Sequence, residues 1–346
     1  MSGPLQGLRV IEGADFSAPL HVRLAIAMAG KIASELGADV AVLEPKGGDP
    51  IRKLPPFLRG AERRSALFEF LNSGKKVVAA NGAHCEEIAA SADAVLVDES
   101  VRLPRDVTAV VVSTFGPHQP EPRGPASELT IMAMTGVLYL IGKQAEEPFR
   151  LPGHQPAYAA GLAAFLALSA GLLAPRPAIA DVCVLDALLW VNWKILSEPA
   201  PQAPSADQAV SEWQAIPASD GHVALVYMDR DWPALVELVG DTRLRDPRFA
   251  TRQSRLENLD VLMDVLRPWF AIRRKADIYR DAQLRKIPLG PVWTISDLLR
   301  DAQYLERDFL ASTLAGVMPR LPVMWNGRRP RASASSRQPI GSLLDV

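Results

Sequence analysis

The first 44 residues hold two short apolar segments separated by one helical segment, and this arrangement constrains the fold more than any other feature. Residues 7–12 and 38–44 are typical of short buried strands. Between them an apolar residue recurs every four positions, at Leu20, Leu24, Met28, Ile32 and Leu36, which is the spacing of one helix face. Gly37 is expected to end that helix. Strand, helix and strand in this order form a βαβ unit and predict a parallel sheet.

The same alternation continues to residue 196. It predicts strands within 75–80, 86–99 and 105–116, helices over 128–142 and 157–173, and a strand running into a helix over 179–196. We therefore predict an α/β fold for the first half of the chain, with helices on both faces of the sheet. This large domain spans residues 1–196.

The second half of the chain differs from the first in composition and in sequence pattern. Residues 197–211 are rich in Pro, Ala and Ser, as expected of a linker between domains. Residues 212–309 carry mostly helical patterns and are predicted to form a smaller α+β domain. The tail, 310–346, is rich in Pro, Arg and Ser near its end, so we expect it to be extended and to cover another surface.

Composition excludes several classes of function. The 346 residues carry a formal net charge of −1, so no basic excess points to a nucleic-acid partner or to a membrane surface. The five histidines and two cysteines lack metal-ligand spacing, which predicts no metal site and no disulfide. No signal peptide is visible, and the apolar run 157–173 is expected to be a buried helix rather than a membrane span. We expect a cytoplasmic protein.

Three short segments carry candidate binding residues. The loop EPKGGDPIR places Glu44, Asp49 and Arg52 after the second strand, where ligands bind in open α/β sheets; an ordinary loop is the alternative. Lys75 and Lys76 suit phosphate oxygens, or are solvated charges. His154 precedes the long helix and either contacts a ligand or caps the helix. No dinucleotide fingerprint or phosphate-binding glycine loop is present.

These segments together resemble the family III CoA-transferases, the group that contains formyl-CoA and carnitine CoA-transferases and 2-methylacyl-CoA racemase. The matching stretches run in family order from end to end: GLRVIEGADFSAPL (7–20), LGADVAVLEPKGGDPIR (36–52), FLNSGKKVV (70–78), MAMTGVLYLIG (132–142), AYAAGLAAFLALSAGLL (157–173), DVCVLDALLW (181–190), DGHVAL (220–225), DPRFATRQSRLENLDVL (246–262) and IPLGPVWTISDLLRDAQYLERDF (287–309).

The resemblance implies an architecture and a ligand. The large domain is expected to be Rossmann-like, the tail to return to it, and two chains to pass through each other as an interlocked dimer. Coenzyme A, as an acyl-CoA, and a small carboxylic acid are the implied substrates, with no metal. By motif position, the implied CoA-binding residues are Ala18, Pro19, Arg52, Lys75 and Lys76.

The resemblance also implies a chemistry whose residues this chain lacks. Family transferases use an aspartate that forms an anhydride and then a thioester with CoA, and its position holds Ala157 here. The racemases add a histidine, whose position holds Ser127. Candidate replacements are Glu128, His154 and Tyr158. The two other acids near these motifs are Asp181 and Asp186, and the second is interpreted as structural.

Three hypotheses follow from this substitution. In the first, the chain is an active CoA-transferase in which another carboxylate, best Glu128, serves as the nucleophile, or in which CoA moves by a ternary-complex route. Alternatively it is a non-catalytic subunit that braces an aspartate-bearing paralogue in a heteromer. The third hypothesis is an acyl-CoA racemase, isomerase or lyase that uses Tyr158 or His154 as acid or base. A homodimer is expected under the first hypothesis.

Overall fold

The chain divides into two compact units in the computed structural model. Unit 1 comprises Met1–Pro199 with Gln303–Val346, and unit 2 comprises Ala200–Ala302. The structure describes residues 3–15, 17–44, 47–58, 63–79, 91–103, 106–118, 124–141, 147–193, 196, 213–313, 316–330 and 336–337. The predicted linker, 197–211, lies outside these residues.

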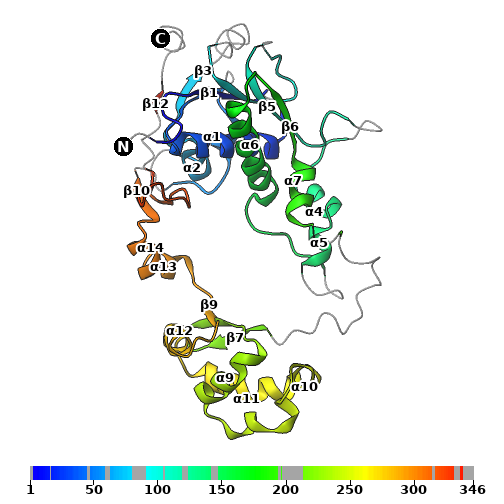
Figure 1. Ribbon diagram of the computed structural model, residues 1–346, viewed down its shortest axis with the longest axis vertical. Coiled ribbons are helices and arrows are strands. Elements are labelled where there is room, and N and C mark those ends of the chain that lie inside the picture. The colour runs from blue at the N-terminus through cyan, green and yellow to red at the C-terminus, as the bar shows by residue number, and fades with distance from the viewer. Residues whose placement is uncertain are drawn as a thin grey trace. The chain divides into compact units, whose positions relative to one another are not determined.

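Unit 1 is built on a seven-stranded sheet with the order β12-β3-β2-β1-β4-β5-β6 (Figure 1). Every pairing in it is parallel, which confirms the predicted sheet. The strand order reverses between β1 and β4, and ligands of such sheets bind at the carboxyl ends of the strands near that point. The strands are β1 (Arg9–Gly13), β2 (Asp39–Glu44), β3 (Lys76–Ala79), β4 (Ala94–Asp98), β5 (Thr108–Ser113), β6 (Ile179–Cys183) and β12 (Ser336–Arg337).

The helices of unit 1 connect these strands. They are α1 (Leu20–Glu35), the 3-10 turn η1 (Pro50–Lys53), α2 (Ala66–Asn72), α4 (Glu128–Met134), α5 (Val137–Leu140), α6 (Gln155–Leu173) and α7 (Val184–Val191). The segment 128–142 was predicted as one helix, and this prediction is wrong. The chain turns at Gly136, whose φ of +72° interrupts the helix and starts α5 in a new direction.

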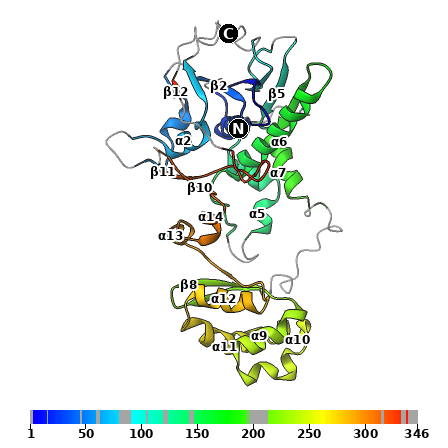
Figure 2. The same ribbon diagram turned by 60° about the vertical axis from the view of Figure 1, so that its left-hand side comes forward.

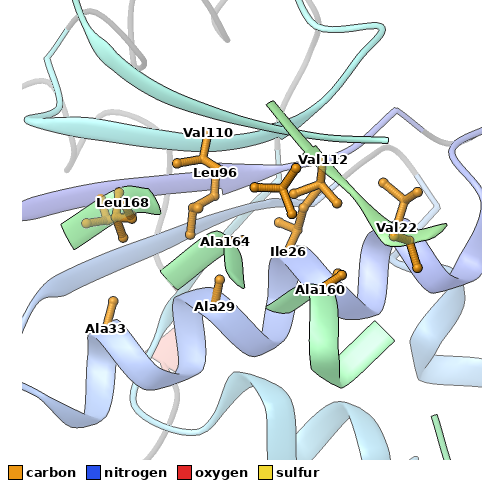
Figure 3. Packing of buried hydrophobic residues seen from close by; sticks show 14 of the residues in the cluster. Val22, Ile26, Ala29, Ala33, Leu96, Val110, Val112, Ala160, Ala164 and Leu168 are labelled. Carbon is orange, nitrogen blue, oxygen red and sulfur yellow. The ribbon is translucent and has the colours of Figure 1, made fainter. Parts of the chain in front are cut away.

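Helices α1 and α6 pack against each other and against the sheet. The pattern of α1 predicts one apolar face, but the helix is buried on nearly all sides. Small residues allow this, because Ala29, Ala160 and Ala164 let the two helices approach closely beneath β4 and β5 (Figure 3). A Cβ on Gly161 would lie 2.7 Å from Cβ of Met28. The α1–α6 crossing therefore depends on small side chains.

Helix α6 is the 19-residue helix of the predicted apolar run, with a mean hydropathy of 1.7 over its most apolar window. By length and composition alone it could cross a membrane. In the structure it contacts α1, β5, β6 and α7. Its residues Ala157, Ala160, Ala164 and Leu168 are fully buried, whereas Leu166 is 65% exposed.

The chain returns to unit 1 after residue 303. Helix α14 (Ala302–Glu306) is followed by the hairpin β10 (Leu310–Thr313) and β11 (Gly316–Pro319). Leu321 then packs on Ile32 and Leu36, and its backbone N–H donates to Glu35 Oε2 at 2.7 Å. Strand β12 finally pairs with β3 at the edge of the sheet.

Unit 2 has the predicted α+β character. Strands β7 (Gln214–Ala218), β8 (Gly221–Leu225) and β9 (Gly290–Pro291) form an antiparallel sheet. Helices gather on it, with α11 against β7 and α12 against β8 and β9 (Figure 2). Its helices and 3-10 turns are η4 (Asp229–Asp231), α9 (Trp232–Val239), η5 (Thr242–Arg245), η6 (Pro247–Phe249), α10 (Arg252–Glu257), α11 (Leu259–Ala271), α12 (Lys275–Leu284) and α13 (Ile295–Leu298).

Candidate active site

The structure brings together the three residues that the sequence offered as replacements for the missing aspartate. Glu128 lies in the first turn of α4, and His154 and Tyr158 lie at the start of α6. The distance from His154 Nδ1 to Glu128 Oε2 is 2.6 Å. The His154 and Tyr158 rings meet edge to face, with centroids 6.2 Å apart. His154 is the N-cap residue of α6, but its side chain makes no capping hydrogen bond and pairs with Glu128 instead.

The Glu128 carboxylate is held at one oxygen only. The residue is buried, with 8% of its surface exposed. An ionised carboxylate only accepts hydrogen bonds, so His154 Nδ1 donates to Oε2. Oε1 is buried and has no hydrogen-bond partner among the residues that the structure describes. Buried polar atoms are normally satisfied, so this oxygen is the site's one unexplained polar group within the described chain.

The charge of this carboxylate acts on two further groups. Burial lowers the pKa of the His21 imidazole, which the negative charge of Glu128 opposes. His21 lies in the first turn of α1, and its Nε2 is 2.7 Å from Thr114 Oγ1, just beyond β5. Burial, and then the charge of Glu128, raises the pKa of the Tyr158 phenol. Sequence reasoning missed His21, although its place two residues after Pro19, a predicted binding residue, was a usable signal.

Ala157 is fully buried in an apolar cluster that includes Leu24, Phe68 and part of Tyr158. A methyl group therefore fills the position where the resemblance implies a carboxylate. Glu128, the carboxylate that the sequence analysis favoured as a replacement, comes from another helix, α4. Asp181 and Asp186, which lie in β6 and α7, are both exposed.

A cavity of about 440 Å³ lies beside this group in unit 1, and we call it the α5–α7 cavity. Tyr158 lines it and also faces Glu128. The cavity wall consists of Val137, Leu140, Ile141, Leu151, Gln155, Tyr158, Ala159, Leu162, Leu188, Val191 and Asn192.

The loop after β2 is held by its own charged residues. Arg52 pairs with Glu44 and stacks on the Phe68 ring, 3.7 Å from the centroid. Asp49 bonds the Ile51 N–H at 2.7 Å and pairs with buried Arg23 at 3.4 Å. Glu44 and Asp49 thus organise the loop, whereas the Arg52 side chain stays 29% exposed. Ala18 and Pro19, at the start of α1, are half-buried and exposed.

The structure corrects the prediction that Lys75 and Lys76 contact a phosphate together. Lys75 has no exposed side-chain surface, and its Nζ lies 2.7 and 2.8 Å from the two oxygens of Glu12. The Lys75 ammonium is therefore paired with a buried carboxylate inside the protein and does not reach the surface. Lys76 pairs at 2.7 Å with Asp39, the first residue of β2. That is the amino end of the strand, opposite the edge that leads to Arg52.

Within the described residues, no group of three His, Cys, Asp or Glu side chains is arranged to hold a metal ion. Cys183 is a free, buried cysteine, and burial raises the pKa of its thiol. Cys85 lies outside the described residues.

Comparison with known proteins decides the family. The family model described as CoA-transferase family III matches residues 5–102 and 98–340. The chain belongs to CoA-transferase family III. The resemblance drawn from the sequence is therefore confirmed.

Curated relatives of this family III chain are CoA-transferases. It is 27% identical to the succinyl-CoA:(R)-benzylsuccinate CoA-transferase subunit BbsE of Thauera aromatica, over 81% of this chain and 78% of the relative. It is 24% identical to the succinate–glutarate CoA-transferase of Agrobacterium fabrum, over 88% and 84%. A solved CaiB/BaiF family protein from Brucella suis has the same fold, with a TM-score of 0.82, 22% identity and coverage of 98% and 97%.

Proposed function

We propose that this chain binds acyl-CoA and moves CoA between carboxylic acids, with Glu128 as the nucleophile in place of the aspartate that Ala157 replaces. One observation carries the proposal. Glu128 is a buried carboxylate whose Oε2 is held by His154 and whose Oε1 has no hydrogen-bond partner in the described chain. An oriented carboxylate with one free oxygen is what an acyl transfer through an anhydride requires.

The proposed reaction has four steps. Oε1 of Glu128 attacks the thioester carbonyl carbon, the carbon–sulfur bond breaks, and CoA leaves as a thiolate from a mixed anhydride. The thiolate then attacks the glutamyl carbonyl, which releases the donor acid and leaves a glutamyl-CoA thioester. The acceptor carboxylate attacks that thioester and expels CoA thiolate. The thiolate attacks the acceptor carbonyl, which forms the new acyl-CoA and restores Glu128.

The neighbouring side chains support these steps. His154 holds the carboxylate through Oε2, which limits the orientations that Oε1 can take. The raised pKa of Tyr158 keeps its phenol protonated at neutral pH. A protonated phenol can donate a hydrogen bond to the oxyanion that forms at each attacked carbonyl. We assign CoA itself to Ala18, Pro19 and the partly exposed Arg52.

The test is covalent trapping. We expect a mass adduct on the peptide that carries Glu128 after the purified chain is incubated with acyl-CoAs and trapped with hydroxylamine or borohydride. Glu128→Gln removes the nucleophilic oxygen's charge and should abolish both the adduct and CoA transfer while CoA binding survives. Intact-protein and peptide mass spectrometry give the readout.

The matched control is Asp186→Asn, which neutralises an exposed carboxylate in the same unit. This variant should keep the adduct and the transfer rate. Undiminished transfer by Glu128→Gln, or an adduct on a different carboxylate, would remove Glu128 from the mechanism. Exchange of the α-proton of an acyl-CoA in heavy water, without any trapped adduct, would favour the racemase or isomerase reading.

The second candidate function is a non-catalytic subunit of a heteromer. The fully buried methyl group of Ala157 favours it, and BbsE is itself named as a subunit. Co-purification with an aspartate-bearing paralogue, together with no adduct on this chain, would support this function. A stable homodimer that catalyses transfer would contradict it.

The proposal includes a homodimer, for which the surface of α7 provides the support. Trp190 is 75% exposed and Trp193 is 58% exposed, and Leu173 at the end of α6 is 87% exposed. Large apolar side chains gathered on a surface commonly mark an interface. We propose that a second copy of the chain covers them.

A further inference from the structure

The residues that the structure places in the wall of the α5–α7 cavity carry no charge. None of its residues is Lys, Arg, His, Asp or Glu, and most are aliphatic. Its polar members are Gln155, Asn192 and Tyr158. The Gln155 amide already donates to the Pro152 carbonyl, and the Asn192 amide to the Thr135 carbonyl, both at 3.3 Å. The described wall is therefore mainly apolar, and its polar atoms belong to the Tyr158 phenol and to the uncharged amides of Gln155 and Asn192.

Tyr158 connects the cavity to the residues around the proposed nucleophile. Gln155, Tyr158, Ala159 and Leu162 line it from one face of α6, at the spacing of successive helix turns. Tyr158 also contacts the His154 ring, whose Nδ1 holds Glu128. An acyl group whose carbonyl carbon reaches Glu128 thus has the cavity beside it, past Tyr158. The volume, about 440 Å³, is in the lower part of the range for small-molecule pockets, which suits an acyl group.

Resting on the proposed function, we infer that the α5–α7 cavity holds the acyl group and that this group is an uncharged alkyl or aryl chain without a second carboxylate. Burying a carboxylate against an apolar wall without a cation is strongly unfavourable. Among the residues that the structure describes, no cation lines this cavity, so none of them neutralises the far end of a dicarboxylic acyl group.

Direct binding tests this inference without requiring turnover. Hexanoyl-CoA and adipyl-CoA have acyl chains of equal length and differ only in the terminal carboxylate. Titration calorimetry of the full chain should give a Kd for hexanoyl-CoA at least about tenfold lower than that for adipyl-CoA. Equal binding, or tighter binding of adipyl-CoA, overturns the inference.

A pair of variants on α6 locates the selectivity. Leu162→Lys places an ammonium in the cavity wall and should reverse the preference in favour of adipyl-CoA. Leu166→Lys is the matched control, because Leu166 lies one turn further along the same helix, is similarly exposed and does not line the cavity. It should keep the wild-type preference. An unchanged preference in Leu162→Lys also overturns the inference.

Two further readouts separate this inference from its alternatives. Suppose that no adduct forms on Glu128, that hexanoyl-CoA is still preferred and that Leu162→Lys reverses the preference. This result would contradict the role of Glu128 as nucleophile and would support the acyl site. If adducts form on Glu128 but adipyl-CoA is preferred, the result supports Glu128 as the nucleophile and contradicts the inference about the acyl site. Light scattering completes the set: a change of oligomeric state in Leu162→Lys alone, with the preference unchanged, assigns the cavity to a second copy of the chain.

Discussion

At the scale of single residues, Lys75 and Lys76 are neighbours in sequence and differ completely in environment. The Lys75 side chain is 0% exposed and contacts Glu12, whereas the Lys76 side chain is 33% exposed and contacts Asp39. Burial raises the pKa of Glu12 to about 7, although the Lys75 ammonium opposes the rise. Burial likewise lowers the pKa of Lys75, against the pull of Glu12. This pair is a structural element beneath α1 rather than part of a binding surface.

Lys75→Met should lower the free energy of unfolding by about 3–5 kcal/mol at pH 8, because it leaves a buried carboxylate without its cation. The loss should shrink as the pH falls. The folded pKa of Glu12 lies above the ordinary value of 4.5, so the folded state binds more protons between these values. The stability linked to protonation of Glu12 is then fully present below pH 4.5, and it is lost as the pH rises through the folded pKa of Glu12. Urea denaturation between pH 5 and pH 8 measures it.

Lys76→Met is the control, because it removes the adjacent charge from a half-exposed pair. Such pairs contribute about 0–1 kcal/mol, so this variant should unfold close to the wild type at every pH. Equal losses in the two variants would contradict the difference in burial.

At the scale of elements, the α1–α6 crossing positions the candidate site. Glu128 comes from α4, and His154 and Tyr158 come from the start of α6, so their meeting depends on where α6 sits against α1 and the sheet. A Cβ on Gly161 would meet Cβ of Met28 at 2.7 Å and the Ala25 carbonyl oxygen at 2.9 Å. Neither atom is the mobile end of a side chain, so the helices must separate to accept it.

Gly161→Ala should therefore destabilise unit 1 by about 1–2 kcal/mol, since the overpacking cost exceeds the helix propensity that alanine gains. The same shift should weaken acyl-CoA binding, because it moves the start of α6. Thermal unfolding and calorimetry measure the two effects. Gly124→Ala serves as the control, since a Cβ there meets open space. A Gly161→Ala protein more stable than the wild type would show that the helices separate without cost.

The elements themselves were largely predictable from the sequence. Periodicity is local, so the strands near residues 7–12 and 38–44 and the helix between them follow from the pattern alone. The single helix expected over 128–142 was wrong, because the pattern stays apolar through the turn at Gly136 while the backbone there adopts a left-handed conformation. Burial of α1 on nearly all sides also escaped prediction, since it depends on which helices cover it.

At the scale of the whole molecule, the chain forms two units with separate cores. The exposed tryptophans in and just after α7, Trp190 and Trp193, are relevant to assembly. Burying Trp190, which is 75% exposed, in an interface would remove a large apolar surface from water. This exposed apolar surface supports the proposed homodimer.

Trp190→Lys should raise the dimer dissociation constant by about tenfold or more, because a charge replaces an apolar anchor. Sedimentation velocity over a concentration series measures the shift. Ile272→Lys is the control, since Ile272 is equally exposed, at 76%, but lies in unit 2 on a different surface. Unchanged association of Trp190→Lys would place the interface elsewhere.

By itself the sequence predicted most of the order of elements and the family resemblance, because these depend on local pattern and motif position, and on the same basis it led to the proposal that Ala157 stands at the family aspartate position. Only the tertiary structure decided which charges meet. Glu128 and His154 are 26 residues apart, and Glu12 and Lys75 are 63 apart. Such pairings depend on how distant elements pack. Packing buries Lys75, a predicted ligand residue, in an ion pair with Glu12. It also brings the three candidate residues Glu128, His154 and Tyr158 together.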